Sequence, residues 1–346
     1  MKKMLYLTLF LAQVAYADPA YQVVDLGEMD AVPVALNDNG GAIAYEVSTD
    51  ALGRTVKKPI AWDGVSWREI GAKTDESLHP QAMNSSGQVV GEYYGSDGNR
   101  YGWAWDKRVG LREADRQHRS SYADINDRGD IAETAEDDQG VRNPYVLSNG
   151  QMTRVFSGQP EASLDGFAAR INTSGEVAGM IDEKSHASFY VAAPGAGGYQ
   201  VKKLSAVFGE GGFATVAGLN SQGVALLNET LCAEEDPCCE QGHGYRVWDS
   251  RTGKVLLSRF NKEFGNVGMA TAINDHGTVV GIGLDSSSWI WDKAYGDTPV
   301  LISSLIDATR WNVLEPRSIN GKGEILAIAL YADDNKRHVV ILQPMK

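Results

Sequence analysis

A four-residue pattern, Asn-x-x-Gly, recurs along the chain and constrains its fold more than any other feature. Successive Asn residues are 47, 42, 46, 48, 54 and 46 positions apart, and a near-constant spacing of this size is typical of repeat proteins. An aliphatic residue precedes each Asn, and a short apolar run follows each Gly. The chain is therefore expected to be an array of seven similar units, which start their patterns at Asn37, Asn84, Asn126, Asn172, Asn220, Asn274 and Asn320.

Each Asn-x-x-Gly predicts a tight turn between two β-strands. Asn suits the first position of a type I turn, and Gly supplies the left-handed residue that closes a hairpin with a bulge. The strand after the turn is apolar and β-branched, as in Gln88–Tyr93. A third segment alternates with a period of two, as in Trp103 and Trp105, and a second turn leads to a fourth segment such as Trp67–Ile70. Each unit is thus predicted to contain four short strands.

The two ends of the chain complete one another. The seventh unit stops after its third strand, while Tyr21–Leu26 resembles the fourth strand Tyr199–Leu204 in sequence and in position. A ring whose first strand completes its last sheet leaves no free edge. Units of 42 to 54 residues are too long for a β-helix coil and too short for a sandwich. We predict an all-β fold, a seven-bladed β-propeller closed by the N-terminal strand, as a single domain over 18–346.

The first 17 residues have the features of a secretory signal peptide. Lys2 and Lys3 precede an apolar segment, Met4–Val14, which is too short to span a membrane, and Ala15-Tyr16-Ala17 offers a small-residue cleavage site. We therefore expect export to the periplasm or beyond the cell. No later apolar run reaches the roughly 18 residues of a spanning helix, so no membrane insertion is expected.

Charge restricts the classes of partner. Cleavage after Ala17 removes two of the 32 Lys and Arg residues and leaves all 45 Asp and Glu residues, a formal net charge of −15. Such a chain repels phosphate backbones and anionic lipids. Nucleic acid is therefore an unexpected partner, and a basic protein or a cation is favoured.

Acidic residues occur in every predicted connection between second and third strands. In a propeller these connections lie on the face opposite the uniform Asn-x-x-Gly turns, and variable loops on a rigid scaffold commonly carry function. The acids make this face a candidate binding surface for a basic partner or a divalent cation, although Asp also simply suits polar turns. The candidate residues are Asp97, Glu136, Asp137, Asp138, Asp182, Glu183, Glu234, Glu235, Asp236, Asp285, Asp333 and Asp334, with Asp50 at the equivalent place in the first unit.

The fifth unit carries an insertion at about 228–244 that holds the three cysteines of the chain, Cys232, Cys238 and Cys239. After export, a disulfide from Cys232 to Cys238 or to Cys239 is expected, and a bond between the adjacent pair is a strained third choice. With His243 the three thiols also form a ligand set for copper or zinc. A redox or intermolecular thiol is the remaining alternative. No other cofactor is expected.

Several further side chains are candidates for chemistry. His79, His118 and His186 fall near the predicted loop face. Asp124 and Arg170 stand two residues before the Asn in adjacent units, where the others carry small residues, so we expect them to form a salt bridge at the central channel. The chain contains no Gly-x-Ser-x-Gly, His-Glu-x-x-His or phosphate-binding Gly loop.

The repeated units resemble the HAF repeats of an extracellular repeat family, which is named for a His-Ala-Phe triplet. The resemblance lies in the Asn-x-x-Gly half and covers nearly all of the chain after residue 17. In the other half the triplet is replaced by Tyr101-Gly102-Trp103, Asn143-Pro144-Tyr145 and Ser287-Ser288-Trp289. The resemblance implies repeat architecture and export, and it carries no established activity.

From the sequence we expect an exported, non-catalytic binding or interaction module that acts through its acidic loop face. Two alternatives stay open. One is a propeller hydrolase or lyase that acts on an extracellular polymer near Asp124, Arg170 and the His-bearing loops. The other is a metal-handling protein that uses the cysteine-bearing insertion.

Overall fold

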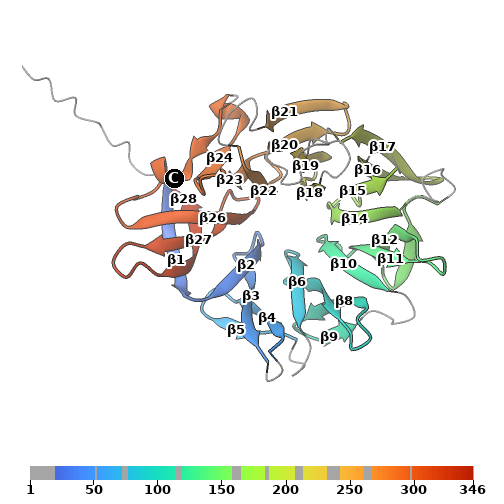
Figure 1. Ribbon diagram of the computed structural model, residues 1–346, viewed down its shortest axis with the longest axis horizontal. Coiled ribbons are helices and arrows are strands. Elements are labelled where there is room, and N and C mark those ends of the chain that lie inside the picture. The colour runs from blue at the N-terminus through green and yellow to red at the C-terminus, as the bar shows by residue number, and fades with distance from the viewer. Residues whose placement is uncertain are drawn as a thin grey trace, which may run out of the picture.

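Seven four-stranded antiparallel sheets surround a central axis (Figure 1). The computed structural model of the chain describes residues 20–50, 53–71, 77–113, 119–157, 165–183, 187–206, 213–231, 242–260, 267–296 and 298–345. The chain is a seven-bladed β-propeller, as the repeat predicts. Blades are numbered here in the order of their Asn-x-x-Gly turns.

The strands of each blade follow one another from the axis outward (Figure 1). The first strands are β2 (Ala31–Leu36), β6 (Leu78–Met83), β10 (Ser120–Ile125), β14 (Asp165–Ile171), β18 (Phe213–Leu219), β22 (Met269–Ile273) and β26 (Trp311–Ile319). The second strands are β3 (Ala42–Thr49), β7 (Val89–Tyr94), β11 (Ile131–Glu136), β15 (Val177–Asp182), β19 (Val224–Leu231), β23 (Val279–Ile282) and β27 (Ile325–Tyr331). The third strands are β4 (Thr55–Trp62), β8 (Arg100–Asp106), β12 (Arg142–Ser148), β16 (Ala187–Gly195), β20 (Gly242–Asp249), β24 (Ser288–Trp291) and β28 (Arg337–Pro344). The outermost strands are β5 (Trp67–Glu69), β9 (Gly110–Glu113), β13 (Gln151–Arg154), β17 (Gly198–Ser205), β21 (Lys254–Phe260), β25 (Val300–Leu301) and β1 (Tyr21–Glu28). Two short 3₁₀ helices, η2 (Lys293–Tyr295) and η3 (Ile302–Ser304), flank β25.

The N-terminal strand closes the ring, as predicted. β1 pairs antiparallel with β28, from Tyr21 opposite Pro344 to Asp25 opposite Val340, and it becomes the outermost strand of blade 7. Leu26 of β1 is buried in a cluster with Leu36 of blade 1 and Leu326 of blade 7. The strand therefore completes the sheet of the last blade and joins it to the first.

The Asn-x-x-Gly segments form the predicted hairpin turns. In all seven, the Asn carbonyl accepts a hydrogen bond from the Gly N–H, and the Asn N–H donates to the carbonyl of the residue after Gly. Each of these glycines has φ between 74° and 84°, the left-handed region that a side chain disfavours. Turn chemistry thus fixes where each first strand ends.

Hydrophobic cores lie between neighbouring sheets. Between blades 1 and 2, for example, Ile43, Val89, Tyr93 and Trp103 pack together. The Trp103 ring lies across Gly91, where an added Cβ would stand 2.7 Å from the ring and 2.1 Å from the carbonyl oxygen of His79. The Gly that ends Val-Val-Gly is therefore required by packing, since only a residue without a side chain admits the aromatic ring.

The Asn side chains do more than shape their own turns. Each Asn Nδ2 donates to the backbone carbonyl of the Asn in the next blade over 2.9–3.3 Å, and Asn320 closes the series by donating to Asn37. Each Oδ1 accepts from the N–H groups two and four residues ahead. All seven Asn residues are buried. We call this closed series of seven side chains the Asn belt.

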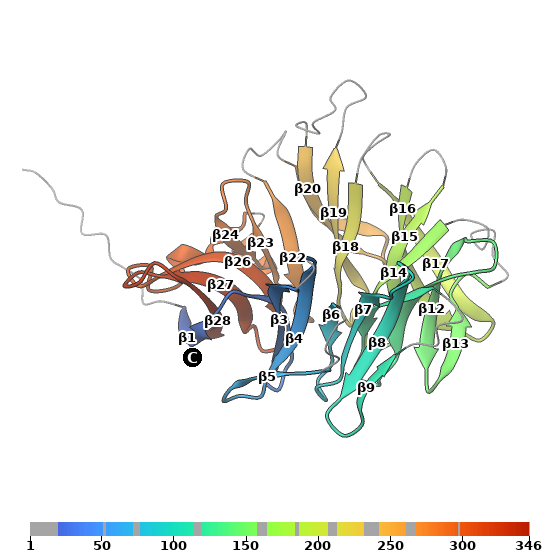
Figure 2. The ribbon, with the colours of Figure 1, turned by 60° about the horizontal axis from the view of Figure 1, so that its bottom comes forward.

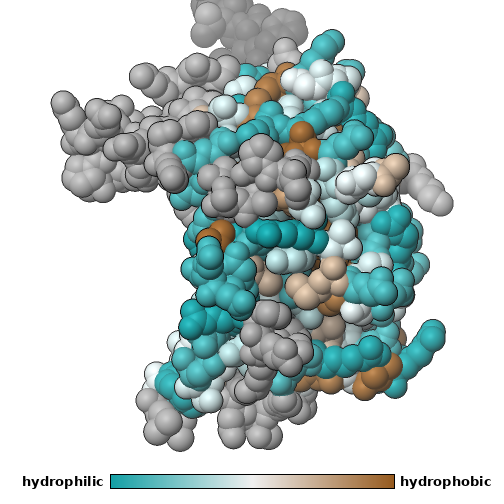
Figure 3. All heavy atoms as spheres, turned by 90° about the vertical axis from the view of Figure 1, so that its right-hand side faces the viewer, coloured by the Kyte–Doolittle hydropathy of each residue, from teal (hydrophilic) through white to brown (hydrophobic). Residues whose placement is uncertain are grey.

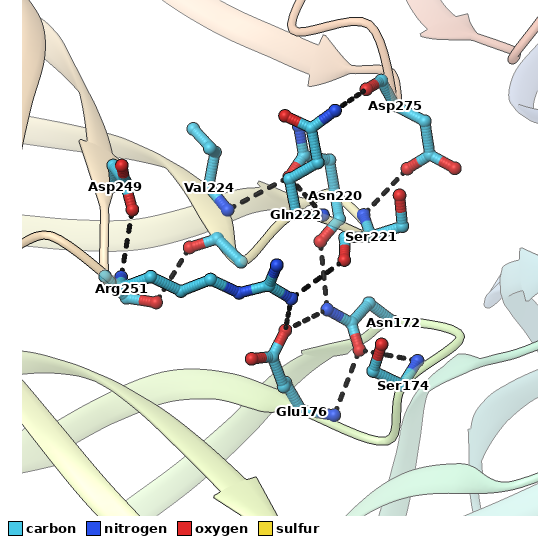
Figure 4. Close-up of polar contacts among 12 residues, drawn as sticks. Asn172, Ser174, Glu176, Asn220, Ser221, Gln222, Val224, Asp249, Arg251 and Asp275 are labelled. Carbon is cyan, nitrogen blue, oxygen red and sulfur yellow. Dashed lines mark hydrogen bonds and ion pairs between the residues drawn. The ribbon is translucent and has the colours of Figure 1, made fainter.

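Figure 4 shows the Asn belt where blade 4 meets blade 5. Asn172 lies between its own turn and Asn220, and its Nδ2 also donates to Glu176. Arg251 reaches from blade 5 to Glu176 over 3.2 Å and to the carbonyl of Ser221. The hairpin face is thus tied together across blades by buried and half-buried polar groups.

Candidate functional site

A cavity of about 1090 Å³ occupies the central channel. Its wall is formed along the first strands, as far as Arg170 and Ala217 near their ends, and by second-strand residues such as Tyr45. Figure 2 shows the blades from the side, with the β8–β9 turn on the hairpin face below. All seven first strands contribute lining residues, among them Val34, His79, Ala123, Arg170, Ala217, Thr271 and Arg317. The cavity is therefore a feature of the whole ring.

A cluster of polar side chains stands on the blade 1 and blade 2 side of the cavity. The Nδ1 of His79 lies 3.3 Å from the Gln81 amide nitrogen and 4.0 Å from Glu92 Oε1. Arg100 forms an ion pair with the other oxygen of Glu92 over 3.3 Å, and the Tyr45 ring meets His79 edge to face. Burial raises the pKa of Glu92, but His79 and Arg100 outweigh it, so the net shift is downward. Glu92 is thus held as a carboxylate between two cationic or polar neighbours.

His79 was predicted near the loop face, and it lies on β6 in the cavity wall. Sequence reasoning missed its neighbours Tyr45, Glu92 and Arg100, and it missed Arg317 on β26. A signal was present for Glu92, because it follows the buried Gly91 in a strand whose residues alternate sides. The alternation does not show which side of the strand faces the channel, because that depends on how the ring closes.

The predicted salt bridge between Asp124 and Arg170 is wrong. The Asp124 carboxylate accepts hydrogen bonds of 2.9 Å from the backbone N–H groups of Ile125 and, in the next blade, Ile171. Arg170 donates instead to the carbonyls of Ala169 and, in the next blade, Ala217. Burial raises the pKa of Asp124, and the charge of Arg170 only partly offsets this effect. Each side chain therefore bonds to backbone groups of the following blade instead of to the other side chain.

Four of the ten described acids of the loop face are engaged by their own loops in the same way. Asp97 accepts from the Tyr101 hydroxyl over 2.6 Å and from the Asn99 N–H over 2.9 Å, which lowers its pKa to about 2. Asp137, Asp285 and Asp334 accept in the same way from N–H groups two residues ahead. These carboxylates act as turn acceptors, the simpler of the two interpretations of the sequence.

Three of the remaining acids form ion pairs with basic residues, and the other three lie in the cavity wall or at the surface. Glu136 pairs with Arg119 over 3.2 Å, Glu183 pairs with Lys203 over 2.9 Å, and Asp50 pairs with Arg54 over 2.6 Å. Asp182 lines the cavity, and Asp138 and Asp333 are exposed. Within the described ranges, no group of three His, Cys, Asp or Glu side chains is placed to hold a metal ion.

Other predicted features fall outside the described residues. These are the signal peptide at 1–17, the three cysteines Cys232, Cys238 and Cys239, the acids Glu234, Glu235 and Asp236, and two histidines, His118 and His186. His243 is described, and its Nδ1 lies 3.2 Å from the Thr230 hydroxyl. In the part of the chain that the structure describes, no helix has the length and apolar character needed to cross a membrane.

The outer wall of the ring offers a contrast to the cavity. On the side shown in Figure 3 the surface is mostly hydrophilic, with isolated hydrophobic residues. The exposed large hydrophobic side chains come from separate blades, such as Val65, Tyr94, Met152 and Leu256. Scattered residues of this kind are ordinary for a protein surface. The cavity is accordingly the stronger candidate site.

Solved structures show what this architecture is similar to. The β-propeller domain of the Trilobed protease from Pyrococcus furiosus matches with a TM-score of 0.54 and 10% identity, over 91% of this chain and 94% of that one. That domain is described as having an open velcro topology, whereas β1 closes the ring here. A chain of the Mitotic Checkpoint Complex matches with a TM-score of 0.54 and 13% identity, over 100% and 98% of the two chains.

An acylaminoacyl peptidase from Pyrococcus horikoshii matches with a TM-score of 0.52 and 11% identity, over 91% of this chain and 52% of that one. At such identities the similarity shows the fold alone. No protein-family model matches the chain, and no curated protein sequence matches it. The resemblance to HAF repeats therefore stays a prediction.

Proposed function

We propose that the chain is an exported, non-catalytic binding module whose ligand occupies the central cavity. The observation that carries the proposal is the cavity itself. Its volume of about 1090 Å³ is at the upper end of that of small-molecule sites, and it combines an apolar wall with a few polar groups, as such sites do. Its lining residues come from the strands of the ring, and some of them, such as His79, Asp182 and Ala187, lie at strand ends next to the variable loops.

The cavity supports the proposal better than the acidic rim. Asp97, Asp137, Asp285 and Asp334 already accept hydrogen bonds from their own loops, so a cation or basic partner would compete with these bonds. The rim remains anionic and would influence which ligands approach the cavity. Affinity is expected to arise inside the ring.

A hydrolase or lyase centred on Asp124 and Arg170 has less support. Both side chains bond to backbone groups of the channel wall, and neither is positioned to activate a nucleophile. Among the described residues, His79 makes its hydrogen-bond contact with Gln81 rather than with a Ser, Thr or Cys. The similarity to a peptidase shows the fold and extends over 52% of that chain.

The proposal is tested by filling the cavity. Thr215→Trp and Ala123→Trp each place an indole in the wall from a different blade. A fragment library is screened by saturation-transfer NMR against the purified chain, and fragments that bind are expected to lose at least tenfold in affinity in both variants. Val65→Trp, at an exposed position on the outer side of blade 1, is the matched control and should bind like the unmodified chain.

Folding of each variant is checked by circular dichroism and thermal unfolding. The use of two blades guards against the failure of one variant to fold. Fragments that bind equally well to both filled variants would show that the cavity is not the binding site.

A further inference from the structure

We propose that the ligand of the central cavity is a monocarboxylate with an apolar body, and that Arg170 binds its carboxylate. This inference rests on the proposed function and names the class of ligand. Its evidence is the way Arg170 is held, the charges around it and the apolar residues beside it.

Arg170 is fixed in the cavity wall with part of its guanidinium unused. Its Nε donates to the Ala217 carbonyl over 3.0 Å and its Nη1 to the Ala169 carbonyl over 2.7 Å. Its Nη2 makes no hydrogen bond within the described part of the chain. Two bonds to backbone carbonyls order a side chain that is otherwise flexible, so little conformational entropy is left to lose when a ligand binds.

No other blade offers a cation at this place. The equivalent residues are Ala35, Ala82, Asp124, Gly218, Ala272 and Ser318. A small residue at this position suffices to build the ring, as four Ala or Gly residues demonstrate. The two backbone bonds explain how the Arg170 side chain is held. The ring does not require an arginine here, and a ligand would account for the remaining nitrogen, Nη2.

Among the described arginines that line the cavity, Arg170 forms no ion pair. Arg100 is paired with Glu92 over 3.3 Å, and Arg317 is paired with Glu315. The nearby carboxyl of Asp124 interacts with the charge of Arg170, but its oxygens are directed at two backbone N–H groups. One guanidinium group with a free nitrogen matches a carboxylate, whereas a phosphate monoester carries about −1.5 to −2 at pH 7.

The surroundings of Arg170 favour an apolar body on that carboxylate. Phe167 and Ala169 line the cavity from β14, and Ala217 lines it from β18, whereas Ala168 and Val216 are buried between blades. Burying alkyl or aryl carbon against such a wall is favourable by roughly 25 cal/mol per Å² of apolar surface. A charge-neutral or fully polar ligand would use only one of these two features.

The test compares ligands that differ only in the head group. Octanoate, octanol and octyl phosphate are titrated calorimetrically into the unmodified chain, and octanoate is expected to bind at least tenfold more tightly than either. Arg170→Met, which keeps the length of the side chain without its charge, should weaken octanoate binding at least tenfold and leave octanol binding unchanged. Arg68→Met, on the exposed outer strand of blade 1, is the matched control and should have no effect.

The comparison of head groups uses the unmodified chain, so it remains valid even if Arg170→Met fails to fold. In that case Arg170→Lys tests whether a positive charge alone is enough for octanoate binding. Acetyl-Ala-Ala-Leu as the free acid and as the amide distinguishes a peptide C-terminus from a free organic acid as the source of the carboxylate. Equal affinity for octanoate and octanol, or absence of binding by every acid at millimolar concentration, would overturn the inference. If neutral fragments still bind and are lost in Thr215→Trp, the proposed function survives while the ligand class is wrong.

Discussion

Glu133 occupies a position where the other six blades carry Gly, Ala or Leu. It lies on β11 at the boundary between blades 2 and 3 and is only 4% exposed. One of its carboxylate oxygens, Oε2, has no hydrogen-bond partner within the described residues. Burial raises its pKa from the usual value near 4.5 to about 7. The folded chain therefore resists ionising this carboxyl group.

Replacing Glu133 by Gln should change how stability depends on pH. Because the pKa in the folded state is raised, the contribution of Glu133 to stability is full below about pH 4.5 and declines as the pH rises through about 7. Gln does not ionise, so the variant should gain about 3 kcal/mol of unfolding free energy relative to the unmodified chain between pH 4.5 and pH 8. Urea denaturation at several pH values measures this difference.

The buried amide of Gln has its own cost, but that cost is the same at every pH and does not affect the slope. Asp138→Asn serves as the control, because it removes an exposed acid from a loop of the same blade. A constant difference between Glu133→Gln and the unmodified chain across this pH range would contradict the raised pKa.

The sequence shows which residues are unusual but not where their atoms go. Asp124 and Arg170 stand out in the alignment of the seven units, and both do line the inner ring. Their opposite charges suggested a pair, yet backbone groups of the next blade lie nearer to each of them. The choice between two such partners depends on offsets of a few ångströms between blades, which repeat spacing does not determine.

At the scale of the element, the Asn-x-x-Gly hairpin was predictable and the Asn belt was not. Type I turn chemistry accounts for Asn and Gly within one blade, and the structure confirms it. Asp serves equally well at that turn position, however, and all seven units carry Asn. The preference for Asn over Asp was the available signal for the belt. The Asn amide donates a hydrogen bond as well as accepting them, whereas the Asp carboxylate only accepts.

Asn274→Asp separates the two roles of this residue. The carboxylate can still accept from the N–H groups of His276 and Thr278, but it cannot donate to the Asn320 carbonyl, which Asn274 reaches over 3.1 Å. Loss of this buried bond should lower the free energy of unfolding by about 1–3 kcal/mol, with a further loss from burying charge. Guanidinium denaturation measures the change.

His276→Ala, at the exposed centre of the same turn, should change stability by less than about 0.5 kcal/mol. If Asn274→Asp were as stable as the unmodified chain, Asn would serve the turn alone, and the bonds of the belt between blades would contribute nothing measurable.

The acidic loops show the same division between composition and geometry. The sequence places an acid in each connection between second and third strands, and the described connections lie on the loop face as topology requires. It does not show that Asp97 or Asp137 turns back onto its own loop. Short-range hydrogen bonds compete with any ligand for such a carboxylate, and only coordinates reveal which of them form.

At the scale of the whole molecule, closure of the ring was the feature that the sequence predicted best. The likeness of Tyr21–Leu26 to Tyr199–Leu204 identified β1 as the missing outer strand, and its pairing with β28 confirms the assignment. The central cavity was not predicted, because its wall takes residues from all seven blades and exists only once the ring has closed. Sequence patterns describe one unit at a time, and a shared cavity belongs to none of them.

Closure by β1 predicts that a core residue of this strand stabilises both ends of the chain. Leu26 is 7% exposed and packs against Leu36 and Ala42 of blade 1 and Leu326 of blade 7. Leu26→Ala should lower the free energy of unfolding by about 2–5 kcal/mol, the usual cost of truncating a buried leucine. Hydrogen exchange should also rise in β28 and in β2 and β3, because the substitution weakens the junction of the last blade with the first.

Leu256→Ala is the matched control, since Leu256 also lies on an outermost strand, β21, but is 50% exposed. Its effect on stability should be under about 0.5 kcal/mol. Faster exchange confined to β1 itself after Leu26→Ala would mean that the strand adds an edge to blade 7 without joining the two blades. Faster exchange on both sides of the junction, with the outer strand of blade 5 unaffected, would show that the ring is held closed through this side chain.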